Sequence, residues 1–168
     1  KRKLGDSIET RPSYVEDREE FGHWEIDTVL GSQSKEDEHL LTIVERKTRN
    51  TLIRKIPGKT AEVVEKEFDR IREEFGSRFH DVFKSLTADN GSEFASLSTL
   101  KEHRVGVYFT HPYSAFERGT NENHNGLVRR FIPKGKKISA YSQEAIERVE
   151  QWMNGLPMEK VRSGWFAR

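Results

Sequence analysis

The sequence predicts an α/β domain with a mixed five-stranded sheet, in which three strands are antiparallel and two are parallel, and with helices on both faces. Three closely spaced segments, rich in alternating apolar and β-branched residues, predict the first strands at 23–31, 40–48 and 50–56. Two shorter apolar runs predict strands at 82–88 and 105–110. A tight turn joins the second and third strands, which makes them antiparallel, whereas helical crossovers make the last two parallel to their neighbours.

Apolar residues at helical spacing predict the covering layers. Four apolar residues between Val64 and Phe75 recur at steps of four, three and four, so a helix over 60–75 has one buried stripe. Thr60 is suited to cap it. A second helix is predicted over 115–131 and a third over 142–154. Helices on both faces of the sheet would leave the carboxyl ends of its strands open to a ligand.

Composition limits the possible classes of protein. The chain has 168 residues, of which 33% are hydrophobic and 34% charged, and it has no cysteine. Disulfide scaffolds and thiolate chemistry are thereby excluded, and no apolar run reaches the ~20 residues of a membrane span. We expect an N-terminal arm or linker at 1–22, a core at 23–160 and a tail at 161–168. Because Lys1 stands first, we also expect a domain cut from a longer protein.

Charge is distributed unevenly along the chain. Residues 1–100 hold 17 basic against 21 acidic side chains, a net charge of −4, and residues 101–168 hold 12 against 7, a net charge of +5. The C-terminal part is therefore the better candidate for a phosphate-facing surface, although a solvated face would give the same count.

Asp27 lies in an alternating run, where Trp24 and Ile26 share one face of a strand and Glu25 and Asp27 share the other. A carboxylate in a central strand needs a partner, because an unpaired buried charge is costly. A metal ion would be such a partner, and an exposed position on a one-sided sheet is the alternative.

Asp89 follows an apolar run and opens the segment Asp-Asn-Gly-Ser-Glu-Phe at 89–94. It therefore falls at the carboxyl end of a strand, where ligands gather in α/β sheets. The alternative is that Asp-Asn-Gly forms only a turn. Glu93 is close enough in sequence to contact the same site.

Glu122 lies in a predicted helix that is dense in asparagine. Glu122, Asn125 and Arg129 follow at i, i+3 and i+7 and form one polar face. Asparagine and glycine are mediocre helix formers, so their density indicates selection for something other than helix stability. His124 could touch a substrate, but we expect it to be solvated.

The densest basic cluster follows this helix directly. It comprises Arg129, Arg130, Lys134, Lys136 and Lys137. The cluster could hold a phosphate backbone beside the acids, and a solvated loop is the alternative.

The three acids, in this order and context, resemble the ribonuclease-H-like core of DDE transposases and retroviral integrases. More closely, the chain is similar to the IS-thirty family of bacterial insertion-sequence transposases. Four segments carry the likeness, at 18–29, 86–94, 111–127 and 130–135. The similarity extends over about 7–160, but two segments, 158–160 and 163–168, depart from the family pattern. We expect the helix-turn-helix region by which such transposases recognise their element's ends to lie outside this sequence.

The resemblance implies a two-metal phosphoryl transferase. Asp27 would bridge two Mg²⁺ ions, for which Mn²⁺ could substitute, and Asp89 and Glu122 would each complete one. The enzyme would cleave DNA at the element's ends and join it to target DNA, with Asn125 and Arg129 lining the cleft and Lys134 to Lys137 holding backbone. The implied partners are transposon-end and target DNA and further copies of the chain, in the bacterial cytoplasm at the nucleoid, with no membrane.

Two alternatives remain open on sequence. A ribonuclease-H-like nuclease would share the fold and the metal site but would only hydrolyse. A domesticated DNA-binding module would have lost catalysis, which the presence of all three acids argues against.

Overall fold

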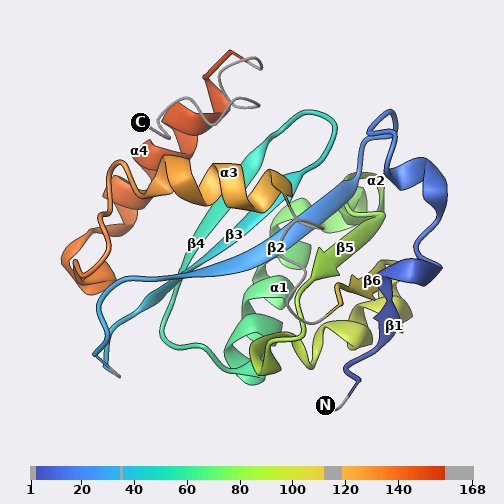
Figure 1. Ribbon diagram of the computed structural model, residues 1–168, viewed down its shortest axis with the longest axis horizontal. Coiled ribbons are helices and arrows are strands. Elements are labelled where there is room, and N and C mark those ends of the chain that lie inside the picture. The colour runs from blue at the N-terminus through green and yellow to red at the C-terminus, as the bar shows by residue number, and fades with distance from the viewer. Residues whose placement is uncertain (1–2, 35, 112–118, 158–168) are drawn as a thin grey trace.

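A mixed sheet of six strands, in the order β1-β6-β5-β2-β3-β4, forms the centre of the computed structural model (Figure 1). The structure describes residues 3–34, 36–111 and 119–157, and for residues 119–122 it describes the backbone alone. The strands are β1 (Asp6–Ser7), β2 (His23–Leu30), β3 (His39–Glu45), β4 (Thr51–Ile56), β5 (Ser85–Ala88) and β6 (Gly106–Phe109). The helices are α1 (Ala61–Phe75), α2 (Phe79–Val82), α3 (Gly119–Val128) and α4 (Gln143–Asn154).

The predicted topology is confirmed for the five longer strands. β2, β3 and β4 are consecutive antiparallel neighbours, and β5 and β6 add in parallel on the other side of β2. The expected strand count is one too low, because β1 pairs in parallel with β6 through only two residues. So short a strand in a polar segment has no periodicity by which sequence could reveal it. The segment expected as an N-terminal arm thus extends the sheet.

Two apolar clusters pack on opposite faces of the sheet. On one face, α1 buries Val64, Phe68 and Ile71 against apolar residues of β2, β3, β5 and β6. On the other, α3 and α4 bury a second cluster that includes Leu127, Ile146 and β3 residue Leu40. Figure 1 shows α3 crossing the sheet on the side opposite α1. Helices on both faces are therefore confirmed.

The helix boundaries follow their capping residues. Thr60 caps α1 as predicted, its hydroxyl accepting from Val63 N at 3.3 Å, and Ser142 caps α4 in the same way. The middle helix is shorter at its C-terminal end than the predicted 115–131, since α3 ends at Val128. Residues 112–118 lie outside the described part of the chain.

Helix α4 also covers the sheet's exposed edge. The backbone N–H of Ile53 in edge strand β4 donates to Glu150 Oε2 at 2.7 Å. Asn154 accepts from Thr51 N at 2.7 Å and donates to Thr51 O at 3.0 Å. Side chains one helical turn apart thus occupy backbone groups that an additional strand would otherwise pair. No helix in the described part of the chain is both long enough and apolar enough to cross a membrane.

Candidate active site

Asp27 lies on β2, and Asp89 directly follows the neighbouring parallel strand β5 at the same level of the sheet. The β2–β5 register pairs Glu25 with Thr87, so two further residues along the chain lead to Asp27 within β2 and to Asp89 just past the end of β5. Neighbouring strands are about 4.8 Å apart, and residues two apart along a strand point to the same face. Both carboxylates are half-buried. The structure therefore brings these two predicted site residues together.

Asn125 connects Asp27 to α3. Its side-chain amide donates to Asp27 Oδ2 at 2.8 Å, while its own oxygen accepts from Thr42 Oγ1 at 3.2 Å. The backbone N–H of Thr28 donates to Asp27 Oδ1 at 2.8 Å. Hydrogen bonds to a carboxylate favour its ionised form and fix its rotamer. Asn125 was predicted as a DNA contact in the cleft, but its role in orienting Asp27 was not predicted.

Glu122 precedes Asn125 by three residues on α3, which is about 4.5 Å along a helix axis. Its backbone therefore lies within one turn of the residue that contacts Asp27. Its side chain lies outside the described atoms. The part of the chain with described side chains contains no group of three His, Cys, Asp or Glu suited to a metal ion.

Asp89 is held at the end of β5 by its own loop, where the backbone N–H of Gly91 donates to Asp89 Oδ1 at 2.7 Å. A Cβ atom on Gly91 would lie 2.8 Å from Asp89 Oδ1 and 2.4 Å from Glu93 Oε2. Gly91 has an ordinary extended backbone with φ −62°. This glycine therefore provides space between two carboxylates, and the bond from its N–H to Asp89 Oδ1 is the Asx turn that an Asp-Asn-Gly sequence favours.

Glu93 is a buried acid beside this site. Thr28 Oγ1 donates to Glu93 Oε1 at 3.3 Å, and Lys59 Nζ lies 3.4 Å from the same oxygen. The carboxylate thus has a basic partner and a hydroxyl donor. The sequence suggested its proximity to Asp89 but could not identify Lys59, which lies on the loop before α1.

His124 is buried, and its expected solvation is wrong. It is only 2% exposed, and its Nε2 lies 3.1 Å from the carbonyl oxygen of Arg49, in the turn between β3 and β4. The residue fixes α3 to the sheet and so belongs to the scaffold of the helix that contains Glu122.

The predicted basic residues lie beyond the end of β2. Arg129 Nη2 donates to Leu30 O at 2.7 Å, and burial lowers the pKa of Arg129. The exposed members are Arg130, Lys134, Lys136 and Lys137.

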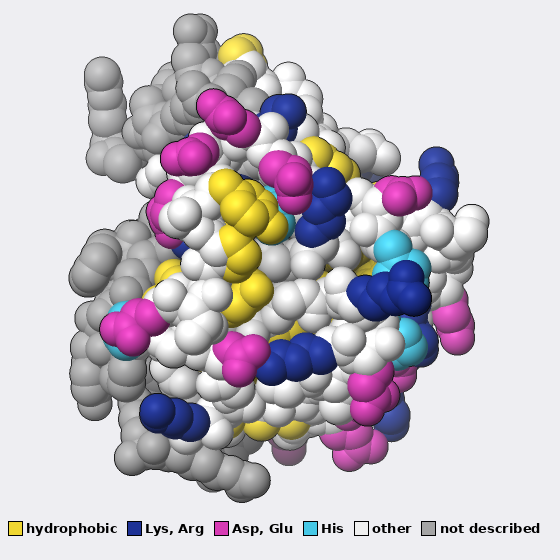
Figure 2. Space-filling model, turned by 90° about the vertical axis from the view of Figure 1, so that its right-hand side faces the viewer, with side chains coloured by type: hydrophobic (Ala, Val, Ile, Leu, Met, Phe, Trp, Pro, Cys, Tyr) yellow, Lys and Arg dark blue, Asp and Glu magenta, His cyan; other side chains and the backbone are white. Residues whose placement is uncertain are grey.

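Figure 2 shows the side of the molecule that lies at the right of Figure 1. Acidic and basic side chains lie side by side on this face, so its described surface has no broad area of one charge.

Asp37 was not predicted as a site residue. It holds in place the 133–139 segment, which contains Lys134, Lys136 and Lys137. The carboxylate is 3% exposed and accepts from the backbone N–H groups of Ser32, Ile138 and Ser139 at 3.0–3.1 Å. Burial alone would raise the pKa of Asp37, but these donors hold that pKa well below its usual value. The 133–139 segment is thereby joined to the β2–β3 connection.

The chain is similar to an integrase family model and to transposases of insertion sequences. Residues 17–115 match the family model described as "Integrase core domain". The chain is 43% identical over 157 residues to a probable transposase for insertion-like sequence element IS1161 of Streptococcus salivarius, covering 94% of this chain and 44% of that protein. It is 35% identical over 159 residues to transposase InsI for insertion sequence element IS30C of Escherichia coli (strain K12), covering 94% and 40%. The chain thus spans less than half the length of these relatives.

A solved structure has a similar fold. A chain of the simian T-cell lymphotropic virus intasome, in complex with PP2A regulatory subunit B56 gamma, matches 84% of this chain and 45% of its own length. The TM-score is 0.55 at 14% sequence identity.

Proposed function

Because the chain belongs to the integrase core domain family, we propose that it is the catalytic domain of a DNA transposase, which cleaves DNA strands and joins them to target DNA. Its relatives named above are transposases of insertion sequences, so the resemblance to the IS-thirty family is confirmed. The observation that carries the proposal is the placement of Asp27 in β2 and of Asp89 at the end of neighbouring β5, with Asp27 hydrogen-bonded to the helix that contains Glu122.

We further propose that Asp27, Asp89 and Glu122 hold two Mg²⁺ ions, for which Mn²⁺ can substitute. The donor chemistry fits, because Mg²⁺ prefers oxygen ligands and takes few protein carboxylates. Two of the three carboxylates are half-buried and fixed by backbone N–H donors, which is the preorganisation that a metal ligand needs. When bound, such ions activate the attacking hydroxyl and stabilise the leaving oxygen of a phosphodiester.

The chain's own residues would prepare this chemistry. Asn125 and Thr28 N–H hold the Asp27 carboxylate in one rotamer, and Gly91 N–H does so for Asp89. Because Asn125 also accepts from Thr42 on β3, the Asp27 carboxylate is tied to both the sheet and α3. A shift of α3 would therefore disturb Asp27 as well as Glu122.

The proposed partner is DNA, both transposon ends and target. Arg130, Lys134, Lys136 and Lys137 are exposed beyond the end of β2 and would neutralise backbone phosphates. Arg129 and Asn125 would line the cleft. We propose that several copies of the chain assemble on the two DNA ends, in the bacterial cytoplasm at the nucleoid.

The test is the substitution Asp89→Asn, with Asp81→Asn as a control because Asp81 is an exposed acid before β5. Loss of a metal ligand should lower Mg²⁺-dependent nicking of duplex DNA at least about a hundredfold. Electron paramagnetic resonance should show weaker Mn²⁺ binding, independently of activity. Asp81→Asn should behave as the wild type. Undiminished nicking by Asp89→Asn would falsify the metal-site assignment.

A second assay separates a transposase from a nuclease that only hydrolyses. Supplied with a DNA duplex already cut to expose a 3′-hydroxyl, the wild-type chain should join that end to a second duplex. Hydrolysis without any joined product would favour the nuclease.

A further inference from the structure

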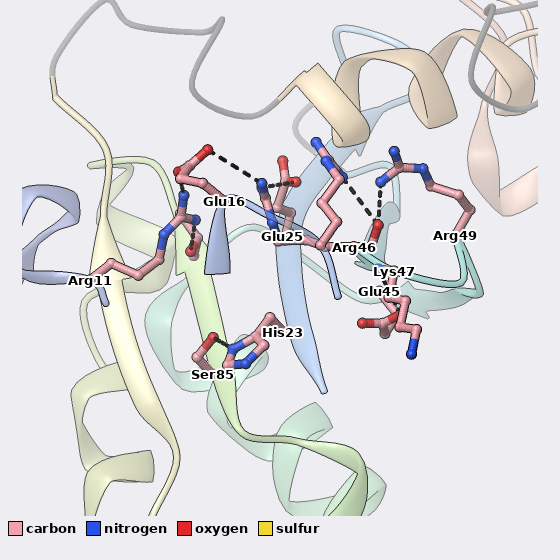
Figure 3. A network of polar contacts seen from close by, with 11 residues as sticks. Arg11, Glu16, His23, Glu25, Glu45, Arg46, Lys47, Arg49 and Ser85 are labelled. Carbon is pink, nitrogen blue, oxygen red and sulfur yellow. Dashed lines mark hydrogen bonds and ion pairs between the residues drawn. The ribbon is translucent and has the colours of Figure 1, made fainter. Parts of the chain in front are cut away.

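A chain of alternating charges, buried except for one carboxylate, lies in the row of side chains next to the two aspartates. It consists of Arg11, Glu16, Arg46 and Glu25, and we call it the arm cluster (Figure 3). Arg46 Nη1 lies 2.8 Å from Glu25 Oε2, and Arg46 Nη2 lies 3.6 Å from Glu16 Oε2. Arg11 contacts the other Glu16 oxygen, Oε1, and donates to Thr87 Oγ1 at 2.9 Å. One carboxylate therefore divides its two oxygens between two guanidinium groups.

The arm cluster occupies the same face of the sheet as the candidate active site. Glu25 precedes Asp27 by two residues, and Thr87 precedes Asp89 by two, so both side chains point to the aspartate face. Two residues along a strand span about 6.6 Å. The cluster is thus the adjacent row of side chains, within the reach of a nucleotide or two of a bound strand.

The members of the arm cluster differ in their exposure to solvent. The side chains of Arg11 and Arg46 are 2% and 4% exposed and that of Glu25 is 0% exposed, whereas the Glu16 side chain is 64% exposed. Two buried arginines are therefore covered by a carboxylate that faces water. Such a carboxylate gains little net free energy from its ion pairs, because water competes for it.

Positive charge exceeds negative charge at this position. Arg18 adds a third guanidinium, donating to Arg46 O at 3.2 Å. Burial and the neighbouring Arg46 charge lower the pKa of both Arg11 and Arg18. Within the described part of the chain, Arg46 Nε is a buried donor with no hydrogen-bond partner. If Glu16 were absent, the three guanidinium groups of Arg11, Arg18 and Arg46 would have Glu25 as the cluster's single carboxylate.

We propose that Arg11 and Arg46 form a binding site for a DNA backbone phosphate, which Glu16 occupies when no DNA is bound. The two unesterified oxygens of a phosphodiester can replace the two oxygens of the Glu16 carboxylate, one at each guanidinium. Glu25 stays on Arg46 and keeps its guanidinium in place. The proposal rests on the proposed function for its ligand, and it assigns the arm to substrate binding in addition to sheet formation.

The experiment is Glu16→Gln, which retains size but removes the competing charge. Binding of a fluorescein-labelled 20-base-pair DNA duplex is followed by fluorescence anisotropy in EDTA, so that neither metal binding nor cleavage contributes. We expect about two- to tenfold tighter binding than the wild type at low salt, falling as salt is added. The matched control is Glu19→Gln, the same charge change at an exposed position of the same arm, which should change affinity less than twofold.

Arg11→Gln supplies an independent variant. It should weaken DNA binding and, combined with Glu16→Gln, should abolish the gain. Equal effects of Glu16→Gln and Glu19→Gln would overturn the proposal, since the effect would then be one of net charge. Unchanged or weaker binding by a folded Glu16→Gln would also overturn it and leave Glu16 as a structural contact. If Glu16→Gln unfolds, Arg11→Gln decides, and unaltered DNA binding by that variant rejects the site.

The outcome is separable from that of the proposed function. A wild type that cleaves DNA in Mg²⁺ while Glu16→Gln binds no tighter rejects only the phosphate site. A wild type that fails to cleave while Glu16→Gln binds tighter rejects the catalytic proposal and retains the phosphate site.

Discussion

Substitution of Asp37 by asparagine should destabilise the protein severely, although Asp37 touches no proposed metal ligand in the described contacts. The backbone N–H groups of Ser32 and Ile138 donate to Asp37 Oδ2, and those of Glu38 and Ser139 donate to Oδ1. An asparagine has an NH₂ group in place of one oxygen. Whichever way it is turned, two backbone donors lose their acceptor in a site that is 3% exposed.

Each buried donor left without a partner costs about 1–3 kcal/mol, so the expected loss for two donors is roughly 2–6 kcal/mol in the free energy of unfolding. For a chain of this size, that is about 4–24 °C in Tm. The matched control is Asp17→Asn, an exposed acid, for which we expect a change within about 0.5 kcal/mol. Urea unfolding at pH 7 measures both.

The pH dependence gives a second measurement. The pKa of Asp37 is depressed in the folded protein, so its contribution is fully present above the unfolded pKa of about 4 and is lost as pH falls through the folded pKa. The gap between wild type and Asp37→Asn should thus be constant above about pH 5 and narrow below about pH 4. Equal stabilities of Asp37→Asn and Asp17→Asn at pH 7 would refute the reasoning.

Three further outcomes are expected. Asn125→Ala should lower the nicking rate about 10- to 100-fold, since a hydrogen bond to a carboxylate is lost, and equal rates for Asn125→Ala and wild type would contradict this role. Thr42→Val, which removes the hydroxyl's bonds to Asn125 and to the Asp27 carbonyl but none to the Asp27 carboxylate, should cost less than tenfold. His124→Gln keeps an amide that can donate to the Arg49 carbonyl, so its Tm should stay within a few degrees of the wild type. His124→Leu lacks a donor and should lower both Tm and the nicking rate. Equal Tm values for His124→Leu and the wild type would show that the hydrogen bond is unimportant. Burial raises the pKa of Glu150, so its ionised form is disfavoured in the folded protein and stability falls as pH rises from the unfolded pKa. Glu150→Gln should therefore unfold at an equal or higher temperature than the wild type at pH 7.5. A clearly lower Tm for Glu150→Gln would contradict this pH dependence.

The parts of the fold that depend on periodicity could be predicted from the sequence. The alternation around Asp27 correctly separated Trp24 and Ile26, which pack on the α1 face, from Glu25 and Asp27 on the other. Strand β1 could not be found, because two residues carry no period. Its pairing with β6 is set by tertiary contact.

The candidate site was predictable where a residue type is unusual in its local context, as for Asp27 and Asp89. Contacts between distant segments were not. Two partners of Asp37, Ile138 and Ser139, lie about a hundred residues away, and both contribute backbone N–H groups that any residue except proline could supply. Arg46 and Glu25 likewise meet only because β3 folds back along β2. Sequence offers no local signal for such pairs.

The central claim is that Asp27 and Asp89 are ligands of the same metal site. The most direct measurement is anomalous X-ray scattering from a crystal of this chain soaked in Mn²⁺. We predict anomalous peaks within coordinating distance of the carboxylate oxygens of both Asp27 and Asp89, on the face of the sheet covered by α3. Manganese bound only elsewhere, or in contact with neither aspartate at saturating concentration, would contradict it.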